Sequence, residues 1–223
     1  METKVNFNIE REQGALLRRV AATMSITLSD HEIEQFERYL SELVEWNRKT
    51  NITSIKETTE IIIKHFIDSL MVLQFISLQG RLADIGAGAG FPGIPIKIRR
   101  PDLDLFLVEP RRKKASFMRK VIRELPLGGV EVYNGRAEEL VGRGFFDFVI
   151  SRALGDLDYF CTVSMPLLKR DGCIIAMQGP KHTEAKENDL MKRLAIEKIN
   201  SFSYNLPLNM GKRQISLFRK CFT

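Results

Sequence analysis

The sequence predicts an α/β fold, in which a helical N-terminal region precedes a mostly parallel sheet that ends in an antiparallel strand pair. Residues 1–80 carry apolar side chains at the spacing of helices. After Gly80, short runs rich in Val, Ile and Phe alternate with amphipathic stretches, which is the pattern of parallel strands joined by helical crossovers. The last two strand-like runs have no helix between them, so we expect them to pair antiparallel. We therefore divide the chain into an N-terminal helical region, residues 1–80, and a second domain, residues 81–223.

The N-terminal region should contain three helices. A short amphipathic helix is expected at about residues 14–24. Ser29 and Asp30 have the character of an N-cap, and the apolar residues that follow recur at intervals of three and four over 31–47. A further helix is expected at about 59–76, after a polar, turn-rich stretch.

Strands and helices then alternate along the second domain. We expect strands at 82–85, 103–108, 130–133, 145–150 and 172–177, and helices at 93–100, 112–125, 136–141, 156–169 and 183–194. The closing strands are expected at 195–205 and 213–222, with a turn at 207–212 between them.

Composition narrows the class of protein. Hydrophobic residues make up 44% and charged residues 28%, which is ordinary for a globular protein. No run of eighteen uncharged apolar residues is present, so we expect no membrane span. The start, METKVNFNIEREQ, lacks the basic-then-apolar order of a secretory signal, and we expect a cytoplasmic protein. The net charge of +6 suits a polyanionic partner such as nucleic acid, although total charge alone is a weak indication.

Cysteine and histidine positions argue against a disulfide framework and a zinc site. Cys161, Cys173 and Cys221 are odd in number and form no C-x-x-C pair, and the three histidines do not cluster. We therefore expect no metal site.

The stretch DIGAGAGFPGIP, residues 84–95, is the most informative part of the sequence. It should lie just beyond the carboxyl end of the first strand, where α/β sheets bind ligands. Gly88-x-Gly90-x-x-Gly93 satisfies the dinucleotide-binding pattern, which by itself is a weak indication. Asp84-x-Gly86-x-Gly88-x-Gly90 instead resembles the first motif of S-adenosylmethionine methyltransferases.

Two acidic residues bear on this choice. A carboxylate at Asp84 would repel a pyrophosphate, whereas it suits the cationic amino-acid end of S-adenosylmethionine. Glu109, at the end of the next strand, can accept hydrogen bonds from both ribose hydroxyls, although NAD enzymes use an acid there as well. The closing antiparallel pair is what the methyltransferase fold adds to a parallel sheet. The structural alternatives are a turn residue or helix cap at Asp84, a solvated strand end at Glu109 and close helix packing at Gly93.

Four motifs, taken together, point to one family. They are W-N-x-x-x-N-[IL]-T at Trp46–Thr53, H-x-x-D-S at His65–Ser69, D-I-G-x-G-x-G-F-P-G-I-P at Asp84–Pro95 and S-R-A at Ser151–Ala153. Over nearly its whole length the chain resembles the bacterial methyltransferases that modify guanine N7 in small-subunit (16S) ribosomal RNA, the glucose-inhibited division protein B family. The resemblance implies a Rossmann-like class I methyltransferase fold, S-adenosyl-L-methionine as cofactor, and 16S ribosomal RNA or the small ribosomal subunit as partner. We expect a monomer.

The resemblance also implies the roles of particular residues. It implies cofactor contacts at Gly86, Phe91, Ala137, Glu138 and Arg152, which join Asp84, Gly88, Gly90 and Glu109 in the candidate cofactor site. Arg152, at the end of the fourth strand, would face the methyl-transfer site. Arg136 and Arg213 fall where the family places basic residues near the RNA-side pocket, and these three arginines are our candidate catalytic residues.

One position departs from the family pattern. Family members often carry Lys-Gly after the fifth strand, where this chain has Gln178-Gly179, so a cation is lost there; Lys181 is a candidate to replace it.

Some of the motif residues also have purely structural interpretations. Trp46 can be a core residue, Arg152 a surface charge, and His65 with Asp68 a brace between a helix and the domain.

Guanine N7 fits the residues that the candidate site offers. Its lone pair is nucleophilic without deprotonation, so the enzyme need only align it with the sulfonium methyl. Transfer to an exocyclic amine commonly uses a D-P-P-Y or N-P-P-Y loop after the fourth strand, where this chain has Ser151-Arg152-Ala153-Leu154. Transfer to a pyrimidine C5 needs a cysteine nucleophile in a Pro-Cys setting, and the sequence contains none.

Basic side chains near the pocket mouth could hold RNA phosphates. The candidates are Arg99, Arg100, the run Arg111–Lys114, Arg119, Lys120 and Arg123, and the run could equally be a solvated helix face. Three other functions remain open at this point: a methyltransferase for another RNA, a protein or a small molecule; a non-catalytic RNA-binding module; and a NAD-dependent oxidoreductase.

Overall fold

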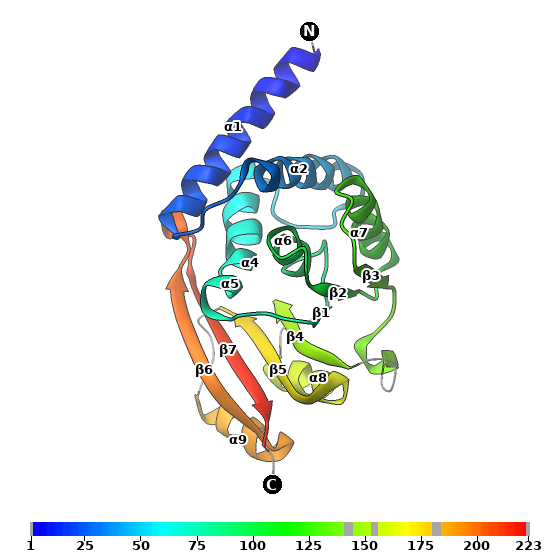
Figure 1. The fold of residues 1–223 in the computed structure, drawn as a ribbon, viewed down its shortest axis with the longest axis vertical. Helices are drawn as coiled ribbons and strands as arrows, with labels where there is room; N and C mark the ends of the chain where they lie inside the picture. The colour runs from blue at the N-terminus through cyan, green and yellow to red at the C-terminus, as the bar shows by residue number, and fades with distance from the viewer. Residues whose placement is uncertain (1, 141–144, 153–155, 180–183, 222–223) are drawn as a thin grey trace.

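The computed structural model describes residues 2–140, 145–152, 156–179 and 184–221 (Figure 1). The helices are α1 (Glu2–Thr23), α2 (Asp30–Thr50), α3 (Thr58–Ile61), α4 (Asp68–Leu70), α5 (Val72–Phe75), α6 (Gly93–Arg99), α7 (Arg112–Glu124), α8 (Leu157–Ser164) and α9 (Glu184–Leu194). The strands are β1 (Arg81–Ile85), β2 (Asp104–Val108), β3 (Val130–Tyr133), β4 (Phe146–Arg152), β5 (Leu168–Gln178), β6 (Ile196–Asn205) and β7 (Lys212–Lys220).

The seven strands form one sheet in the order β3-β2-β1-β4-β5-β7-β6. Strands β1 to β5 are parallel, and β7 runs antiparallel to both β5 and β6. The predicted fold class, with its closing antiparallel pair, is confirmed. Strand order reverses between β1 and β4, and this is the point at which such sheets bind ligands beyond their carboxyl ends.

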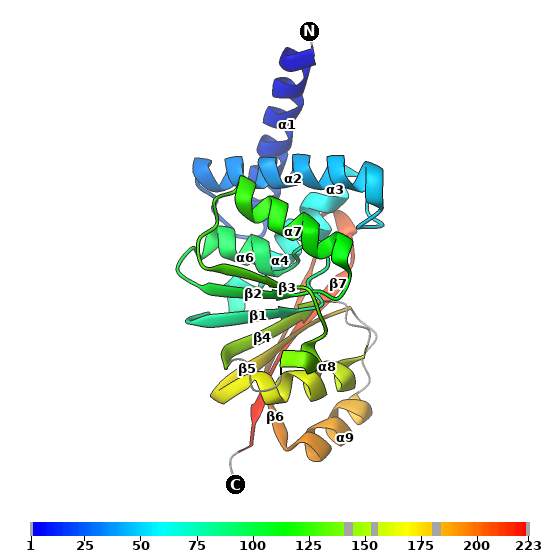
Figure 2. The same cartoon turned by 90° about the vertical axis from the view of Figure 1, so that its right-hand side faces the viewer.

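Helices cover both faces of the sheet. In the edge-on view of Figure 2, α2, α4, α6 and α7 lie on one side, and α8 and α9 lie on the other. One hydrophobic cluster fills each face, and the larger cluster joins the N-terminal helices to α6, α7 and the sheet. Side chains on both sides of residue 80 therefore share one core. No helix of the described residues is both long and apolar enough to cross a membrane.

The cap predicted at Ser29 is present. Ser29 is the N-cap of α2, and its side chain and that of Glu32 exchange hydrogen bonds with each other's backbone N–H groups in a capping box. The apolar stripe of α2 is buried, including Phe36, Tyr39 and Leu43.

Four helix predictions differ from the structure. The short helix expected at 14–24 is longer, because α1 already begins at Glu2. The helix expected at 59–76 is interrupted, because a π-helical turn, Ile62–Ile67, separates α3 from α4. The helix expected at 136–141 is a short 3₁₀ turn at Ala137–Leu140. The helix expected at 156–169 ends in a 3₁₀ turn at Met165–Leu167, and β5 begins at Leu168 with a register shift against β4. Apolar spacing alone does not distinguish these turns from regular helix.

Candidate functional site

The glycine loop after β1 is held against the end of β2. The N–H groups of Gly86 and Ala87 donate to the carbonyl of Val108, at 2.9 and 3.0 Å. Gly88 and Gly90 have φ angles of 62° and 99°, which residues with a Cβ rarely adopt. A Cβ on Gly90 would lie 2.8 Å from the Tyr39 hydroxyl, whereas one on Gly88 would meet nothing nearer than 3.8 Å. The backbone at Gly88 therefore lies open to a ligand.

Helix α2 supports this loop through Tyr39. The fully buried Tyr39 donates its hydroxyl hydrogen to the carbonyl of Ala89 at 2.5 Å. Its ring stacks on Phe91, with ring centroids 5.3 Å apart. Sequence reasoning missed this role, because Tyr39 falls within the regular apolar stripe of its helix.

Asp84 lies fully buried at the end of β1. Its Oδ2 accepts a hydrogen bond from the N–H of Gly93, the first residue of α6, at 2.8 Å. This oxygen therefore has the helix-capping role that was the structural alternative for Asp84. Its Oδ1 has no hydrogen-bond partner among the described residues. Burial raises the pKa of Asp84 to about 7, against the lowering effects of the Gly93 hydrogen bond and the Arg152 charge. A Cβ on Gly93 would lie 2.6 Å from Leu107, so Gly93 does allow close packing of α6 on the sheet.

Glu109 is not a solvated strand end, which corrects the alternative interpretation. Its side chain is buried, and Oε2 accepts a hydrogen bond from the Gly88 N–H at 2.9 Å. Its Oε1 accepts a hydrogen bond from the Arg111 N–H at 2.8 Å. Glu109 thus ties the glycine loop to the start of α7.

Arg152, at the end of β4, is a largely buried cation and not a plain surface charge. Its side chain is 16% exposed, and Nη1 donates to the carbonyl of Lys64 at 2.6 Å. Its Nη2 lies 2.8 Å from Nδ1 of His65. The guanidinium also lies over the ring of Phe91, 5.2 Å from the ring centroid, which is within the range of a cation–π contact.

His65 is held as a neutral imidazole. Burial, followed by the charge of Arg152, lowers its pKa to about 3. Because Arg152 donates to Nδ1, the remaining ring proton is on Nε2, which lies 3.2 Å from the Thr53 hydroxyl. The ring also stacks on Phe91, with centroids 4.4 Å apart. Both nitrogens of His65 are therefore engaged.

The motif at Trp46–Thr53 supports His65 from the turn that follows α2. Asn51 has left-handed backbone angles and is the C-cap of α2. The Asn47 side chain accepts a hydrogen bond from the Thr53 N–H at 3.0 Å, which places Thr53 beside His65. Trp46 packs against the core, 5.7 Å from the ring of Phe117, as the core interpretation predicts.

Asp68 brings two of the three candidate arginines together. This carboxylate is 2% exposed, and its Oδ2 lies 3.5 Å from both Arg152 Nη1 and Arg213 Nε. Its Oδ1 accepts a hydrogen bond from the Tyr204 hydroxyl at 2.8 Å. His65 and Asp68 do brace the helices against the sheet: His65 contacts Arg152, and Asp68 faces both Arg152 and Arg213, two of the candidate residues.

The third candidate arginine lies with a different group. Ala137 is buried in the 3₁₀ turn after β3, while Arg136 and Glu138 are exposed. Glu138 accepts a hydrogen bond from the Tyr159 hydroxyl at 2.7 Å. The pKa of Glu138 is lowered by a hydrogen bond from its own backbone N–H, by the bond from Tyr159 and by the charge of Arg136. Among the described residues, no hydrogen bond or ion pair joins Arg136 to Asp68, the carboxylate that faces Arg152 and Arg213.

The departure at Gln178 lies at the end of β5. Gln178 is paired in register with Gln214 of β7. Lys181, proposed to replace its charge, and Ala153 of the S-R-A motif lie outside the described residues. Within the described ranges, no group of three or more His, Cys, Asp or Glu is placed to hold a metal ion.

The basic residues proposed for RNA divide into two kinds. Arg99 is paired with Glu32 at 2.9 Å, Arg100 with Asp102 at 2.6 Å and Lys120 with Glu42 at 2.5 Å. These three are less available to phosphates than the sequence suggested, because their charge is already matched by an acid. Arg119 donates to the carbonyl of Val132, and Arg123 lies 3.7 Å from Glu124.

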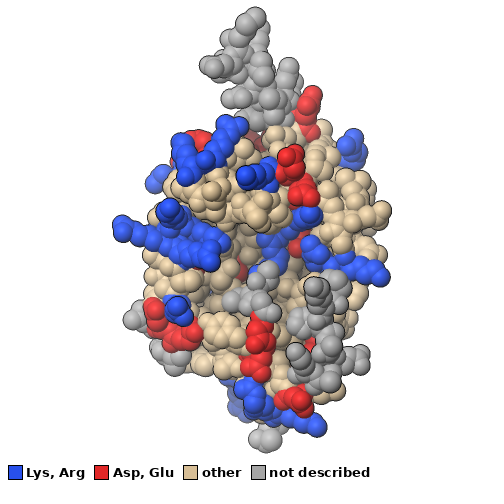
Figure 3. Space-filling view, turned by 180° about the vertical axis from the view of Figure 1, so that it is seen from behind, with Lys and Arg blue, Asp and Glu red and all other residues tan. Residues whose placement is uncertain are grey.

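The run that begins α7 is free of such pairing. Arg111, Arg112 and Lys113 are exposed, and in the described part of the chain their side chains have no hydrogen-bond or ion-pair partner. Figure 3 shows the face at the carboxyl ends of the parallel strands, where Lys and Arg side chains gather over the side that carries α7 and again near the centre.

Comparison with known proteins gives the family. The model of the GidB family, rRNA small subunit methyltransferase G, matches residues 32–215. The chain is 40% identical over 209 residues to ribosomal RNA small subunit methyltransferase G of Desulfitobacterium hafniense (strain Y51), covering 91% of this chain and 85% of that protein. It is 38% identical over 213 residues to the protein of the same name from Geotalea uraniireducens (strain Rf4), covering 92% of this chain and 95% of that protein.

Solved structures share the fold at low identity. Ribosomal protein L11 methylase from Lactobacillus delbrueckii subsp. bulgaricus matches with a TM-score of 0.57 and 11% identity over 70% of this chain and 79% of that one. P. horikoshii TYW2 in complex with MeSAdo matches with a TM-score of 0.53 and 14% identity over 69% of this chain and 62% of that one. The fold, the motif residues gathered at the switch point and the match over residues 32–215 agree: the chain belongs to the GidB family, rRNA small subunit methyltransferase G.

Proposed function

We propose that this protein transfers the methyl group of S-adenosyl-L-methionine to N7 of a guanine in 16S ribosomal RNA. Membership of the GidB family makes it an S-adenosylmethionine-dependent ribosomal RNA methyltransferase, and the match over residues 32–215 is the observation that carries the proposal. Asp84, Glu109 and Arg152 lie at the carboxyl ends of β1, β2 and β4, where a sheet of this order binds its ligand, and this supports the proposal.

The residues present fit the cofactor. The free Oδ1 of Asp84 is a buried acceptor without a donor, which the ammonium group of the cofactor can supply. Each carboxylate oxygen of Glu109 accepts one backbone hydrogen bond and keeps a further lone pair for a ribose hydroxyl. The open backbone at Gly88 admits a close neighbour. We assign the remaining contacts to Gly86, Gly90, Phe91, Ala137, Glu138 and Arg152. When bound, the cofactor supplies a methyl group activated by its sulfonium charge.

The protein has to position guanine N7 and need not deprotonate it. His65 cannot act as a general base in this arrangement, because both of its nitrogens are engaged and its pKa is lowered to about 3. Arg152 and Arg213 are fixed donors on either side of Asp68. We assign them to orient the guanine, with Arg136 at the RNA side; such positioning can supply much of the rate enhancement.

We further propose that the protein acts as a monomer in the cytoplasm, on free 16S ribosomal RNA or on the small ribosomal subunit. The exposed basic run at the start of α7 supports the RNA partner. When a Lys or Arg side chain neutralises an RNA phosphate, counterions condensed on the RNA are released, and this release favours binding.

Two measurements test the proposal. Titration calorimetry should show that S-adenosylhomocysteine binds and that NAD does not. In ribosomal RNA from a strain that lacks the gene, one N7-methylguanine of 16S ribosomal RNA should be missing, and purified protein with S-adenosylmethionine should restore it. Binding of NAD in place of S-adenosylhomocysteine would refute the methyltransferase, whereas RNA binding without any methyl transfer would identify a non-catalytic module.

A further inference from the structure

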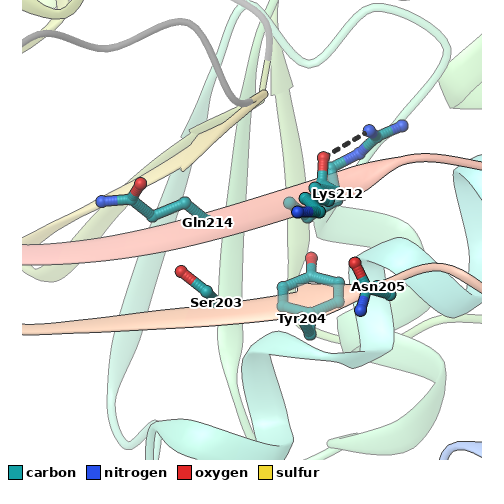
Figure 4. Close-up of a pocket in the computed structure, with 6 residues that line it drawn as sticks. Ser203, Tyr204, Asn205, Lys212 and Gln214 are labelled. Carbon is teal, nitrogen blue, oxygen red and sulfur yellow. Dashed lines mark hydrogen bonds between the residues drawn. The ribbon is translucent and has the colours of Figure 1, made fainter.

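The ends of β6 and β7 form a pocket beside the candidate site. The pocket has a volume of about 320 Å³ and is lined by Ser203, Tyr204, Asn205, Lys212, Arg213 and Gln214 (Figure 4). None of these six residues is acidic, two are cationic, and Ser203 and Asn205 add a hydroxyl and an amide group. The Tyr204 hydroxyl already donates to Asp68, and the Gln214 amide already donates to Ser201 and Ser216. Such a lining suits an anion that accepts several hydrogen bonds.

Strand register places this pocket at the same edge of the sheet as Arg152. Arg152 is paired with Met177 of β5, Met177 with Ile215 of β7, and Ile215 with Phe202 of β6. The pocket residues on both strands follow this row toward the carboxyl edge. Only β5 separates β4 from β7, so the two strands are about 10 Å apart.

Arg213 connects the pocket to the arginine cluster. Its Nε lies 3.5 Å from Asp68, and its Nη1 donates to the carbonyl of Lys212 at 3.0 Å, the dashed line in Figure 4. Arg213 and Arg152 share a single carboxylate, Asp68, so Arg213 has no acidic partner of its own among the described residues. Lys212 is exposed, and its ammonium has no hydrogen-bond or ion-pair partner among the described residues.

We propose that this pocket binds a phosphate of the RNA strand next to the target guanine. The inference rests on the proposed function, since a strand whose guanine reaches Arg152 must continue past one of the neighbouring strand ends. Lys212 supplies an unmatched cation, while Ser203 and Asn205 supply neutral donors on the opposite strand. Family members often carry a lysine at the position of Gln178, at the end of β5. Because β7 pairs with β5, Lys212 supplies a positive charge at the same edge of the sheet.

The salt dependence of RNA binding tests this assignment. The ligand is 16S ribosomal RNA from a strain that lacks the gene, and the variant is Lys212→Gln. We expect affinity at low salt to fall about fivefold, as for an exposed charge pair. The slope of log affinity against log salt should become shallower by roughly 0.7. Affinity for S-adenosylhomocysteine and the melting temperature should not change.

Two further variants control for general charge loss. Lys212→Arg keeps the cation and should bind RNA as the unmodified protein does. Lys220→Gln removes a charge from the other end of the same strand, about 26 Å away, and should leave the slope unchanged.

The outcomes separate the two proposals. If Lys212→Gln keeps the original slope, or if Lys220→Gln changes it equally, the pocket does not hold a phosphate; continued methylation of the RNA would leave the proposed function intact. If the unmodified protein neither binds nor methylates this RNA, the proposed function and the pocket assignment are both wrong.

Discussion

A single buried carboxylate organises the candidate site at the scale of residues. Asp68 faces Arg152 and Arg213 and accepts a hydrogen bond from Tyr204. A charge pair inside a protein is costly to break, because the partner left behind is a desolvated charge. Asp68 should therefore determine where both guanidinium groups lie.

Replacing Asp68 by Asn should slow methyl transfer more than it weakens cofactor binding. The amide can still accept the Tyr204 hydrogen bond, but it removes the negative charge between the arginines. We expect kcat to fall on the order of tenfold, the effect of losing about 1.4 kcal/mol of positioning. Asp68→Glu should restore part of the rate. An unchanged kcat together with a lower melting temperature would show that Asp68 is only a structural brace.

The buried Asp84 should make the stability of the cofactor-free protein depend on pH. Its pKa is raised to about 7 from 3.8, so between these values the folded state binds more protons than the unfolded state. The free energy of unfolding should therefore decrease, by about a few kcal/mol, as pH rises through this window. Asp84→Asn should remove that decrease, which urea melts at pH 5 and pH 8 would measure. Equal pH dependence in both proteins would contradict a buried, raised carboxyl group.

Glu109→Ala should weaken binding of S-adenosylhomocysteine. The loss should be about 1–3 kcal/mol, the cost of removing hydrogen bonds to a charged acceptor. Calorimetry would measure it, with Glu131→Ala, an exposed acid on β3, as the matched control. An unchanged affinity would mean that Glu109 serves only to join the glycine loop to α7.

At the scale of elements, α7 combines a core face with a free cationic end. Its buried residues include Phe117, Met118 and Val121, and its exposed start carries Arg111 as N-cap followed by Arg112 and Lys113. Lys114 lies nearer the glycine loop, since its Nζ would be 3.8 Å from a Cβ on Gly88. RNA binding and cofactor binding can therefore be separated by sparing Lys114.

Changing Arg111, Arg112 and Lys113 together to Gln should weaken RNA binding and leave cofactor binding unchanged. The slope of log affinity against log salt concentration should become shallower by roughly 0.7 for each phosphate that these side chains no longer neutralise. The fold should be retained, because surface substitutions usually change stability by only about 0.5 kcal/mol each. A control with Arg100, Lys169 and Arg219, all paired with acids, changed to Gln should have a smaller effect. Equal effects would mean that only net charge matters.

At the scale of the whole molecule, the N-terminal helices belong to the same core as the sheet. Phe36 and Phe66 pack in one cluster with Ile94, Phe117 and Ile215. Tyr39, His65 and Asp68 also reach the glycine loop and the arginines. We still propose that the helical region ends at residue 80. The hydrophobic core, however, contains side chains from both sides of this boundary.

Deleting residues 1–80 should abolish cooperative folding. The deletion would expose the apolar faces of α6 and α7, and one large side chain removed from a core already costs about 3–5 kcal/mol. Far-ultraviolet circular dichroism during heating and binding of S-adenosylhomocysteine would test this. A shortened chain that melts cooperatively and binds the cofactor analogue would show that residues 81–223 fold independently.

The order of strands and helices could be predicted from the sequence because it depends on local patterns. Alternating apolar runs and amphipathic stretches indicated every strand to within a few residues, and the absence of a helix between the last two strands indicated their antiparallel pairing. The position of Asp84 and the glycine loop directly after β1 could be predicted as well, because the motif follows a short apolar run and precedes a helix; their role in binding the cofactor stays a prediction. Turn types were not predicted, since a π-helical or 3₁₀ turn keeps nearly the same apolar spacing as an α-helix.

What the sequence determined by itself is the α/β fold, the position of the glycine loop and, through four motifs, the family. Only the tertiary structure decided which side chains meet. It joined Asp68 to Arg152 and Arg213 from positions 84 and 145 residues apart, placed Tyr39 under the loop, and left Arg136 with Glu138 and Tyr159. Local sequence patterns report burial and backbone preference, whereas contacts over such separations depend on how strand order and helix packing bring distant segments together.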